Sequence, residues 1–244
     1  MSNHGAILIV GASGATGRWV VRKLLDRGRS VRAIVRSPAT FTEALGTHPR
    51  LTAIHAAVLD LTDAELAQHV AGCQAVVSCL GHNLDLKGIY GKPRRLVTEA
   101  TRRLCEAIRF NTPATPVKFV LMNSAGCRNE RLAEKVSLAE RLVLGLLRLL
   151  VPPHADNEQA VGYLIEQVGT GNGFVEWVAV RPDSLIDADI VTAYGTHPSP
   201  TRSALFNAGR TSRINVTHFM ADLITDDAVW KAWKGQTPVI YDAD

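Results

Sequence analysis

Short apolar runs alternate with stretches of helical periodicity along the first half of the chain. The runs at 6–10, 30–36, 51–60, 74–81 and 117–124 are typical of strands buried on both faces of a sheet. Helical patterns separate them over 19–28, 38–46 and 62–72, and from about Tyr90 or Pro93 to Phe110. Strands that alternate with helices indicate parallel βαβ units. The pattern predicts an α/β fold with a doubly wound parallel sheet, the Rossmann fold.

The second half of the chain is less regular. One helix should end at Pro152 and Pro153, because proline breaks a helix interior, and another should run from near His154 to about Val168. A sixth strand is predicted over 174–182, a strand-like piece over 212–216, a helix over 217–225 and a last strand over 238–242. We expect a single domain over 1–244, in which residues 125–175 and 183–235 form a small substrate-side lobe.

Composition and charge narrow the classes of partner. The chain is 46% hydrophobic and 20% charged, with a net charge of +4 from scattered basic residues, so a nucleic-acid partner is not expected. The longest apolar segment, Leu142 to Val151, is about half the length that crosses a bilayer and contains Arg148. It is interpreted as a packed helix or a wall of the substrate pocket, without a membrane partner; a monomer and a homodimer both remain open.

Cysteine usage points to a reducing compartment. None of the four cysteines forms a Cys-x-x-Cys pair, which favours buried free thiols. No signal peptide is visible, because the first apolar run is short and leads directly into a glycine turn. We therefore expect a cytoplasmic protein. The histidines lack metal-ligand spacing, so no metal site is predicted.

The stretch VGASGATGR, from Val10 to Arg18, places three glycines between the first strand and the first helix. Gly11 would permit the tight turn, Gly14 the close approach of a pyrophosphate, and Gly17 the packing of helix on strand. The helix N-terminus adds free N–H groups and positive dipole character. The candidate phosphate-binding residues are Gly11, Ser13, Gly14, Ala15, Thr16, Gly17 and Arg18.

The end of the second strand indicates which dinucleotide is bound. An acidic residue there would bond the adenosine 2′-hydroxyl of NAD, but this chain has Arg36. An arginine suits a 2′-phosphate by charge and by bidentate geometry, so NADP(H) is the expected cofactor. If Arg36 is only a solvated strand end, that preference disappears.

The chain resembles the atypical short-chain dehydrogenases/reductases, close to the NmrA-like and biliverdin reductase B-like NAD(P)H-binding proteins. The resemblance covers nearly the whole length and rests on GASGATGR, VRSP, VLDLTD, SCLG, NSAG, VAVRPDSL and TSRINVTHFMADLITDD. The first of these motifs is specific for the superfamily, and the others occur in the expected order.

The resemblance implies further cofactor contacts. Asp60 and Leu61 would lie at the adenine, although Asp60 could equally cap the following helix. Leu80 and Gly81 would line the cofactor beside the fourth strand. Ser124 would face the nicotinamide and the substrate, and Pro182 would lie near the carboxamide.

The catalytic residues depart from the superfamily pattern. Many active members use a Tyr-x-x-x-Lys pair, but no tyrosine here is followed by lysine four positions later. His154 and Asn157 are the polar residues in that region, and histidine can donate a proton near neutral pH. Ser124 could position the substrate oxygen or only bond the cofactor, and His154 could instead pack at the start of its helix.

Three functions remain open from the sequence. The leading hypothesis is an NADPH-dependent reductase of a small hydrophobic carbonyl-, flavin- or quinone-like substrate. Such acceptors require little beyond placement against a hydride donor, which is compatible with the missing tyrosine–lysine pair. The alternatives are a non-enzymatic redox sensor with a protein partner, and a redox-neutral isomerase or epimerase that retains its cofactor.

Overall fold

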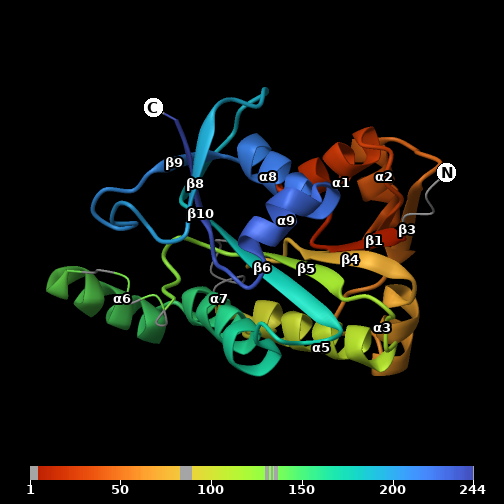
Figure 1. Ribbon diagram of the computed structural model, residues 1–244, viewed down its shortest axis with the longest axis horizontal. Coiled ribbons are helices and arrows are strands. Elements are labelled where there is room, and N and C mark those ends of the chain that lie inside the picture. Colours follow the sequence, from red (N-terminus) through yellow and green to blue (C-terminus); the bar gives the residue numbers. More distant parts are fainter. Residues whose placement is uncertain (1–4, 83–89, 130–131, 133, 135–136, 244) are drawn as a thin grey trace.

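A computed structural model describes residues 5–82, 90–129, 132, 134 and 137–243, and a single large sheet runs through its centre (Figure 1). The strand order is β3-β2-β1-β4-β5-β6-β10-β8. The strands are β1 (Ala6–Val10), β2 (Val31–Val35), β3 (Leu51–His55), β4 (Cys73–Ser78), β5 (Val117–Met122), β6 (Val175–Pro182), β8 (Tyr194–His197) and β10 (Val239–Asp242). Strands β1 to β6 are parallel in the 3-2-1-4-5-6 order, which confirms the doubly wound Rossmann fold.

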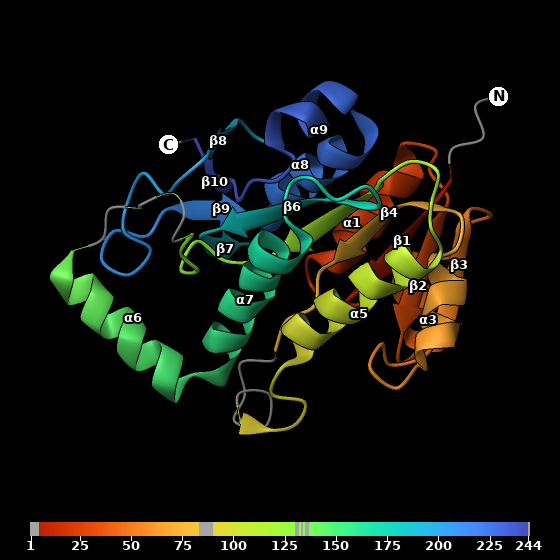
Figure 2. The same ribbon diagram turned by 60° about the horizontal axis from the view of Figure 1, so that its bottom comes forward.

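Helices cover both faces of the sheet, each over its own apolar core (Figures 1 and 2). On one face lie α3 (Asp63–Val70), α5 (Leu96–Phe110), α7 (Pro152–Tyr163) and the π-helix η2 (Leu164–Val168). On the other lie α1 (Gly17–Asp26), α2 (Pro38–Leu45), α8 (Arg213–Thr225) and α9 (Asp227–Trp233). A further helix, α6 (Leu138–Leu150), precedes α7, and the short strands β7 (Ser184–Ile186) and β9 (Arg210–Ser212) pair separately.

Several predicted boundaries were wrong for local reasons. The strand-like piece over 212–216 is the start of α8, because the Ser212 side chain caps that helix by accepting from the Asn215 N–H. The third strand ends at His55 and is followed by a turn. Helix α5 starts only at Leu96, and α7 begins at Pro152, since proline is tolerated in a first helical turn.

A buried ion pair organises the chain that follows β5. The guanidinium of Arg181, fully buried at the end of β6, donates to Glu134 Oε1 at 2.7 Å and to the carbonyls of Cys127 and Thr237 at 2.9 and 2.7 Å. Glu134 in turn accepts the Asn129 N–H at 3.0 Å. Because each buried charge has several partners, the network holds the segment after Ser124 against β6 and β10.

Helix α6 differs from the expectation of a packed helix. Leu144 is buried, but Leu142, Leu146 and Leu150 are 77%, 55% and 53% exposed. Both views show α6 projecting from the edge of the molecule (Figures 1 and 2). Within the described residues, no helix has the length and apolar character needed to cross a membrane.

Candidate dinucleotide-binding site

The residues predicted to hold a cofactor gather at the carboxyl edge of the parallel sheet. Val10 pairs with Ile34 of β2 and with Ser78 of β4, and Met122 of β5 pairs with Val180 of β6. The segments that follow these strands therefore emerge side by side. In a doubly wound sheet, this edge is where ligands bind.

The glycine turn is shaped by direct backbone contact. Gly11 has φ +72°, and a β-carbon there would lie 2.5 Å from the carbonyl of Cys79. A β-carbon on Gly17 would lie 2.1 Å from the carbonyl oxygen of Gly11, and one on Gly14 would lie 3.2 Å from the same atom. Any side chain at position 11 or 17 would push the turn away from β4 or from α1. The first and third glycines are thus required by packing.

The N-terminus of α1 is open to an external anion. Ser13, Gly14 and Ala15 are exposed, whereas Thr16 is buried at the N-cap. In the described part of the chain, no side chain caps this helix end, and its first turn contains no acidic residue. The leading N–H groups and the positive end of the helix dipole are therefore available to a phosphate. Arg18, the second residue of α1, is exposed beside them.

Arg36 follows β2 directly and its side chain is exposed at the same edge. Asp60 and Leu61 lie in the turn after β3, where Asp60 is exposed and Leu61 packs against the core. Asp60 is not the helix cap that one interpretation allowed. The cap of α3 is Thr62, which forms a reciprocal capping box with Glu65.

The sequence did not indicate the residue that holds the turn after β3. Arg103 of α5 donates to the Leu59 carbonyl at 3.1 Å, to the Leu61 carbonyl and to Asp63 Oδ1 at 2.8 Å. Its partners are carbonyls distant in sequence, and nothing in the local pattern around position 103 indicated them.

The centre of the edge is formed by the ends of β4, β5 and β6. Leu80 packs against the core after β4, and Gly81 beside it is exposed, with open space around its α-carbon. Ser124 is exposed after β5, and its Oγ accepts the Gly126 N–H at 3.3 Å. The buried Pro182 ends β6, and its carbonyl accepts the Ala125 N–H at 2.8 Å.

The structure brings both His154 and Ser124 next to Gly126. A β-carbon on Gly126 would lie 3.7 Å from Ser124 Oγ and 3.8 Å from His154 Cε1. His154 Nε2 lies 3.4 Å from Glu158 Oε1, and both side chains are largely buried. Burial by itself raises the pKa of Glu158, but its contacts with His154 and Arg148 outweigh this and lower the pKa overall.

Asn157 is committed to structural bonds. Its side-chain amide donates to the Pro153 carbonyl at 3.0 Å, and its own carbonyl accepts from Asn123 Nδ2 at 2.9 Å. Asn123 also bonds the Ser124 N–H through its side-chain oxygen at 2.8 Å. This chain of bonds fixes α7 against the end of β5, and through it the relative positions of His154 and Ser124.

A second histidine–carboxylate pair was not predicted. His82, one residue after Gly81, places Nε2 2.7 Å from Asp156 Oδ2, and their side chains are 5% and 1% exposed. Asp156 also accepts the backbone N–H groups of Val97 and Thr98 at 2.8 and 2.9 Å. One carboxylate of α7 thus caps the start of α5 and holds the chain after β4.

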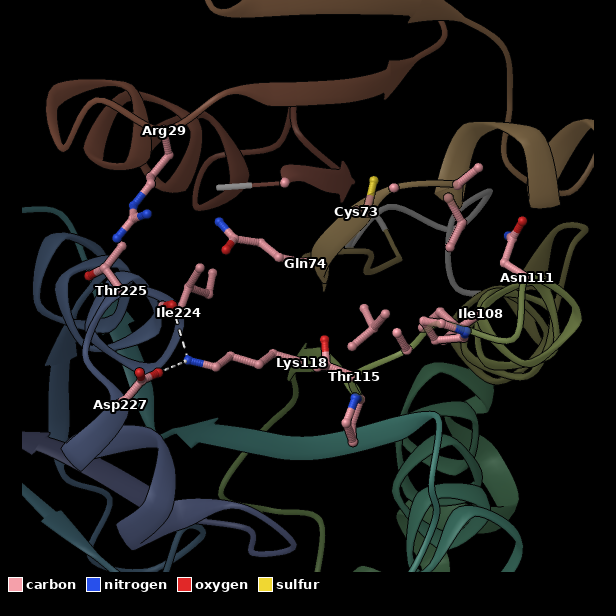
Figure 3. A pocket seen from close by; sticks show the side chains of 18 residues that line it. Arg29, Cys73, Gln74, Ile108, Asn111, Thr115, Lys118, Ile224, Thr225 and Asp227 are labelled. Carbon is pink, nitrogen blue, oxygen red and sulfur yellow. Dashed lines mark hydrogen bonds and ion pairs between the residues drawn. The ribbon is translucent and has the colours of Figure 1, made fainter. Parts of the chain in front are cut away.

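Cavities open away from this edge as well. A cavity of about 850 Å³ lies at the amino ends of β4 and β5, where Figure 3 shows Lys118 directed toward Asp227. Lys118 Nζ donates to Asp227 Oδ1 at 2.8 Å and to the Ile224 carbonyl at 3.2 Å. Another cavity, of about 760 Å³, is lined by α5, α7 and Arg148. The first lies at the sheet edge opposite the glycine turn, so it is separate from the candidate cofactor site.

The doubly wound sheet and the glycine turn at its carboxyl edge together define a Rossmann-type dinucleotide-binding protein. A family model described as NAD(P)H-binding matches residues 11–227, so the chain belongs to this NAD(P)H-binding family, and its fold is that of the atypical short-chain dehydrogenases/reductases. Membership of this family supports a nicotinamide cofactor.

Proteins whose names state an activity or a ligand are similar to this chain either over a short segment or at low sequence identity. A dihydroflavonol 4-reductase from Zea mays is 39% identical over 82 residues, which cover 33% of this chain and only 22% of the plant protein. A putative NADH-flavin reductase from Streptococcus pneumoniae has a TM-score of 0.68 at 15% identity, with 98% of this chain and 100% of that chain covered. A short-chain dehydrogenase/reductase from Veillonella parvula in complex with NADP has a TM-score of 0.67 at 15% identity, with coverages of 98% and 95%.

Proposed function

We propose that this protein is an NADPH-dependent reductase of a small hydrophobic carbonyl-, flavin- or quinone-like substrate, active as a monomer or a homodimer. The observation that carries the proposal is the exposed Arg36, placed after β2 beside the glycine turn. Arginine at this position supplies a charged, bidentate partner for a 2′-phosphate. Among the similar proteins, a plant dihydroflavonol 4-reductase and a putative NADH-flavin reductase support a reductase, and a short-chain dehydrogenase/reductase solved with NADP supports the choice of cofactor.

The described residues fit such a cofactor. The uncapped N-terminus of α1, with Gly14 and Ala15 exposed, would receive the diphosphate. Arg18 and Arg36 would take the 2′-phosphate. Asp60 and Leu61 would contact the adenine, and Leu80, Gly81 and Pro182 would line the nicotinamide half. When bound, the reduced nicotinamide supplies the hydride.

The remaining chemistry belongs to residues around Ser124. Its exposed Oγ would hold the substrate oxygen, and His154, which also lies next to Gly126, would deliver the proton. The Glu158 carboxylate, 3.4 Å from His154 Nε2, would hold the imidazole in place for this transfer. Asn157 would act by positioning α7. Residues 125–175 and 183–235 would enclose the substrate side.

The cofactor part is tested by equilibrium binding of NADPH and NADH, measured by fluorescence titration. Loss of a charged hydrogen-bonding partner costs about 1.5–3 kcal/mol, so Arg36→Ala should weaken NADPH about 10- to 100-fold. NADH, which has no 2′-phosphate, should bind the variant nearly as well as the wild type. Equal weakening of both cofactors would contradict the assignment of Arg36.

The reaction is tested with NADPH deuterated at the transferable position, mixed with flavins, quinones and aldehydes. Deuterium in a reduced product establishes the reductase, and His154→Ala should then slow turnover while NADPH binding stays unchanged. An unchanged rate would remove His154 as the proton donor. Binding without oxidation of any acceptor would favour the redox sensor or the redox-neutral enzyme, and the search would move to a protein partner or an isomerised product.

A further inference from the structure

Helix α6 presents one continuous apolar face to solvent. Ala139, Leu142, Val143, Leu146 and Leu150 recur at the three- and four-residue spacing that places side chains on one side of a helix, and all five are exposed. We call these five residues the α6 face. Leu142 is 77% exposed, and the opposite side of the helix holds the buried Leu144 and Glu140. A surface of this kind is uncommon on a protein that makes no further contact.

The charged residues around the α6 face are basic. Arg141 is exposed on the polar side of the helix, and Arg148 on the same side is paired with Glu158 of α7 at 2.6 Å. The glutamate of the helix, Glu140, is buried and accepts a hydrogen bond from Ser203 at 2.8 Å. The exposed Tyr90 donates to the Leu150 carbonyl at 3.3 Å and so brings its segment to the C-terminal end of α6. That segment adds three exposed cations: Lys92, Arg94 and Arg95.

These charges disfavour a second copy of the chain as the occupant. A two-fold contact through the α6 face would bring the basic residues of both copies together, which costs energy in a protein interface. The face is also small, because thirteen helical residues form a strip about 20 Å long and about 10 Å wide. Stable interfaces bury roughly 800 Å² on each partner.

We infer that the α6 face docks on a membrane surface that contains anionic phospholipid. Leucine side chains on one side of a projecting helix would enter the boundary between headgroups and acyl chains. Lys92, Arg94 and Arg95, near the C-terminal end of the helix, would reach the phosphates, and Tyr90 has the amphipathic ring that favours this depth. The inference departs from the sequence-based expectation of no membrane partner, and it is independent of the proposed reaction.

The test is vesicle flotation of the full chain with phosphatidylcholine alone and with phosphatidylcholine mixed with phosphatidylglycerol. The wild type should bind the anionic vesicles at least tenfold better, and added salt should weaken that binding. The double variant Leu142→Ser/Leu146→Ser should lose about tenfold or more of the binding, because two exposed leucines no longer enter the lipid. Arg94→Gln/Arg95→Gln should reduce the preference for anionic vesicles.

A matched control distinguishes vesicle binding by the α6 face from binding by any exposed apolar side chain. Phe110→Ser/Ile190→Ser removes two side chains that are 78% and 71% exposed elsewhere in the chain, and it should bind vesicles like the wild type. Thermal unfolding checks that every variant is folded. Absence of vesicle binding by the wild type, or equal loss in both double variants, overturns the inference. A wild-type dimer that Leu142→Ser/Leu146→Ser converts to a monomer would assign the face to a second copy instead.

Discussion

His82 Nε2 and Asp156 Oδ2 lie 2.7 Å apart, and this buried contact joins the chain after β4 to α7. Asp156 retains its two bonds to backbone N–H groups at the start of α5 when the histidine is removed. Mutation of each residue can therefore distinguish the role of His82 from that of Asp156. His82 bears on the position of the cofactor-lining segment, whereas Asp156 bears on the fold as well.

His82→Ala should weaken NADPH binding about tenfold, because Leu80 and Gly81 lose their nearby anchor. It should destabilise the fold less than a change at Asp156, because the carboxylate keeps its two backbone N–H donors. Asp156→Asn should lower the free energy of unfolding by about 1–3 kcal/mol, since a buried carboxylate acceptor is replaced by an amide that cannot satisfy every donor. Fluorescence titration and urea unfolding measure the two effects.

The matched control is His218→Ala. His218 also contacts an aspartate, with Nδ1 3.1 Å from Asp222 Oδ2, but it lies on α8. NADPH affinity should be unchanged in this variant. Wild-type affinity in His82→Ala would show that the buried pair has no part in cofactor binding.

Gly17→Ala should damage both the fold and cofactor binding. Its β-carbon would lie 2.1 Å from the Gly11 carbonyl oxygen, a backbone atom that cannot move without shifting the turn. Strain of this kind costs about 1–3 kcal/mol, and the displaced N–H groups would no longer converge on a phosphate. Gly171→Ala, in an exposed loop away from the carboxyl edge of the sheet, is the control, because nothing lies within 4 Å of the added carbon. Similar unfolding free energies and NADPH affinities in the two variants would refute the packing argument.

The pair of Glu158 with His154 and Arg148 predicts a pH dependence of stability. Because the pKa of Glu158 is lowered from its ordinary 4.5 in the folded protein, the unfolded chain binds more protons in acid. The carboxylate's contribution is therefore present above pH 4.5 and is lost as pH falls through the lower folded value.

Urea unfolding between pH 7 and pH 3 measures this contribution. Glu158→Gln should be less stable than the wild type at pH 7, and the difference should shrink toward pH 3. The exposed Glu43→Gln serves as the control and should follow the wild-type profile. A difference between wild type and Glu158→Gln that stays constant with pH would rule out ionisation as its source.

The elements that could be predicted from the sequence are those with a local cause. Thr62 and Glu65 lie three positions apart, and the capping box that their spacing indicates forms as expected. The glycines at 11 and 17 likewise follow from a strand that must turn tightly into a helix. The four cysteines are free, as the absence of close pairs suggested, and three of them are buried.

The features that could not be predicted depend on distant partners. His82 and Asp156 are 74 positions apart, and neither has a local pattern that names the other. The apolar periodicity of α6 is the same for a helix buried in a core and for one that faces solvent, so its exposure could not be read from the sequence. The start of α8 was mistaken for a strand because Ser212, its cap, stands next to apolar residues that also suit a sheet.

The two apolar layers of the sheet each enclose a tryptophan. Trp177 packs on the side of α5 and α7 and donates from Nε1 to the Gly169 carbonyl at 2.8 Å. Trp230 packs on the side of α1 and α8 and donates to Glu176 at 2.7 Å. Variants that keep only one of the four tryptophans, either Trp177 or Trp230, would each fluoresce from a single layer. Comparing their emission during denaturation would reveal whether the two halves of the molecule melt together or in sequence.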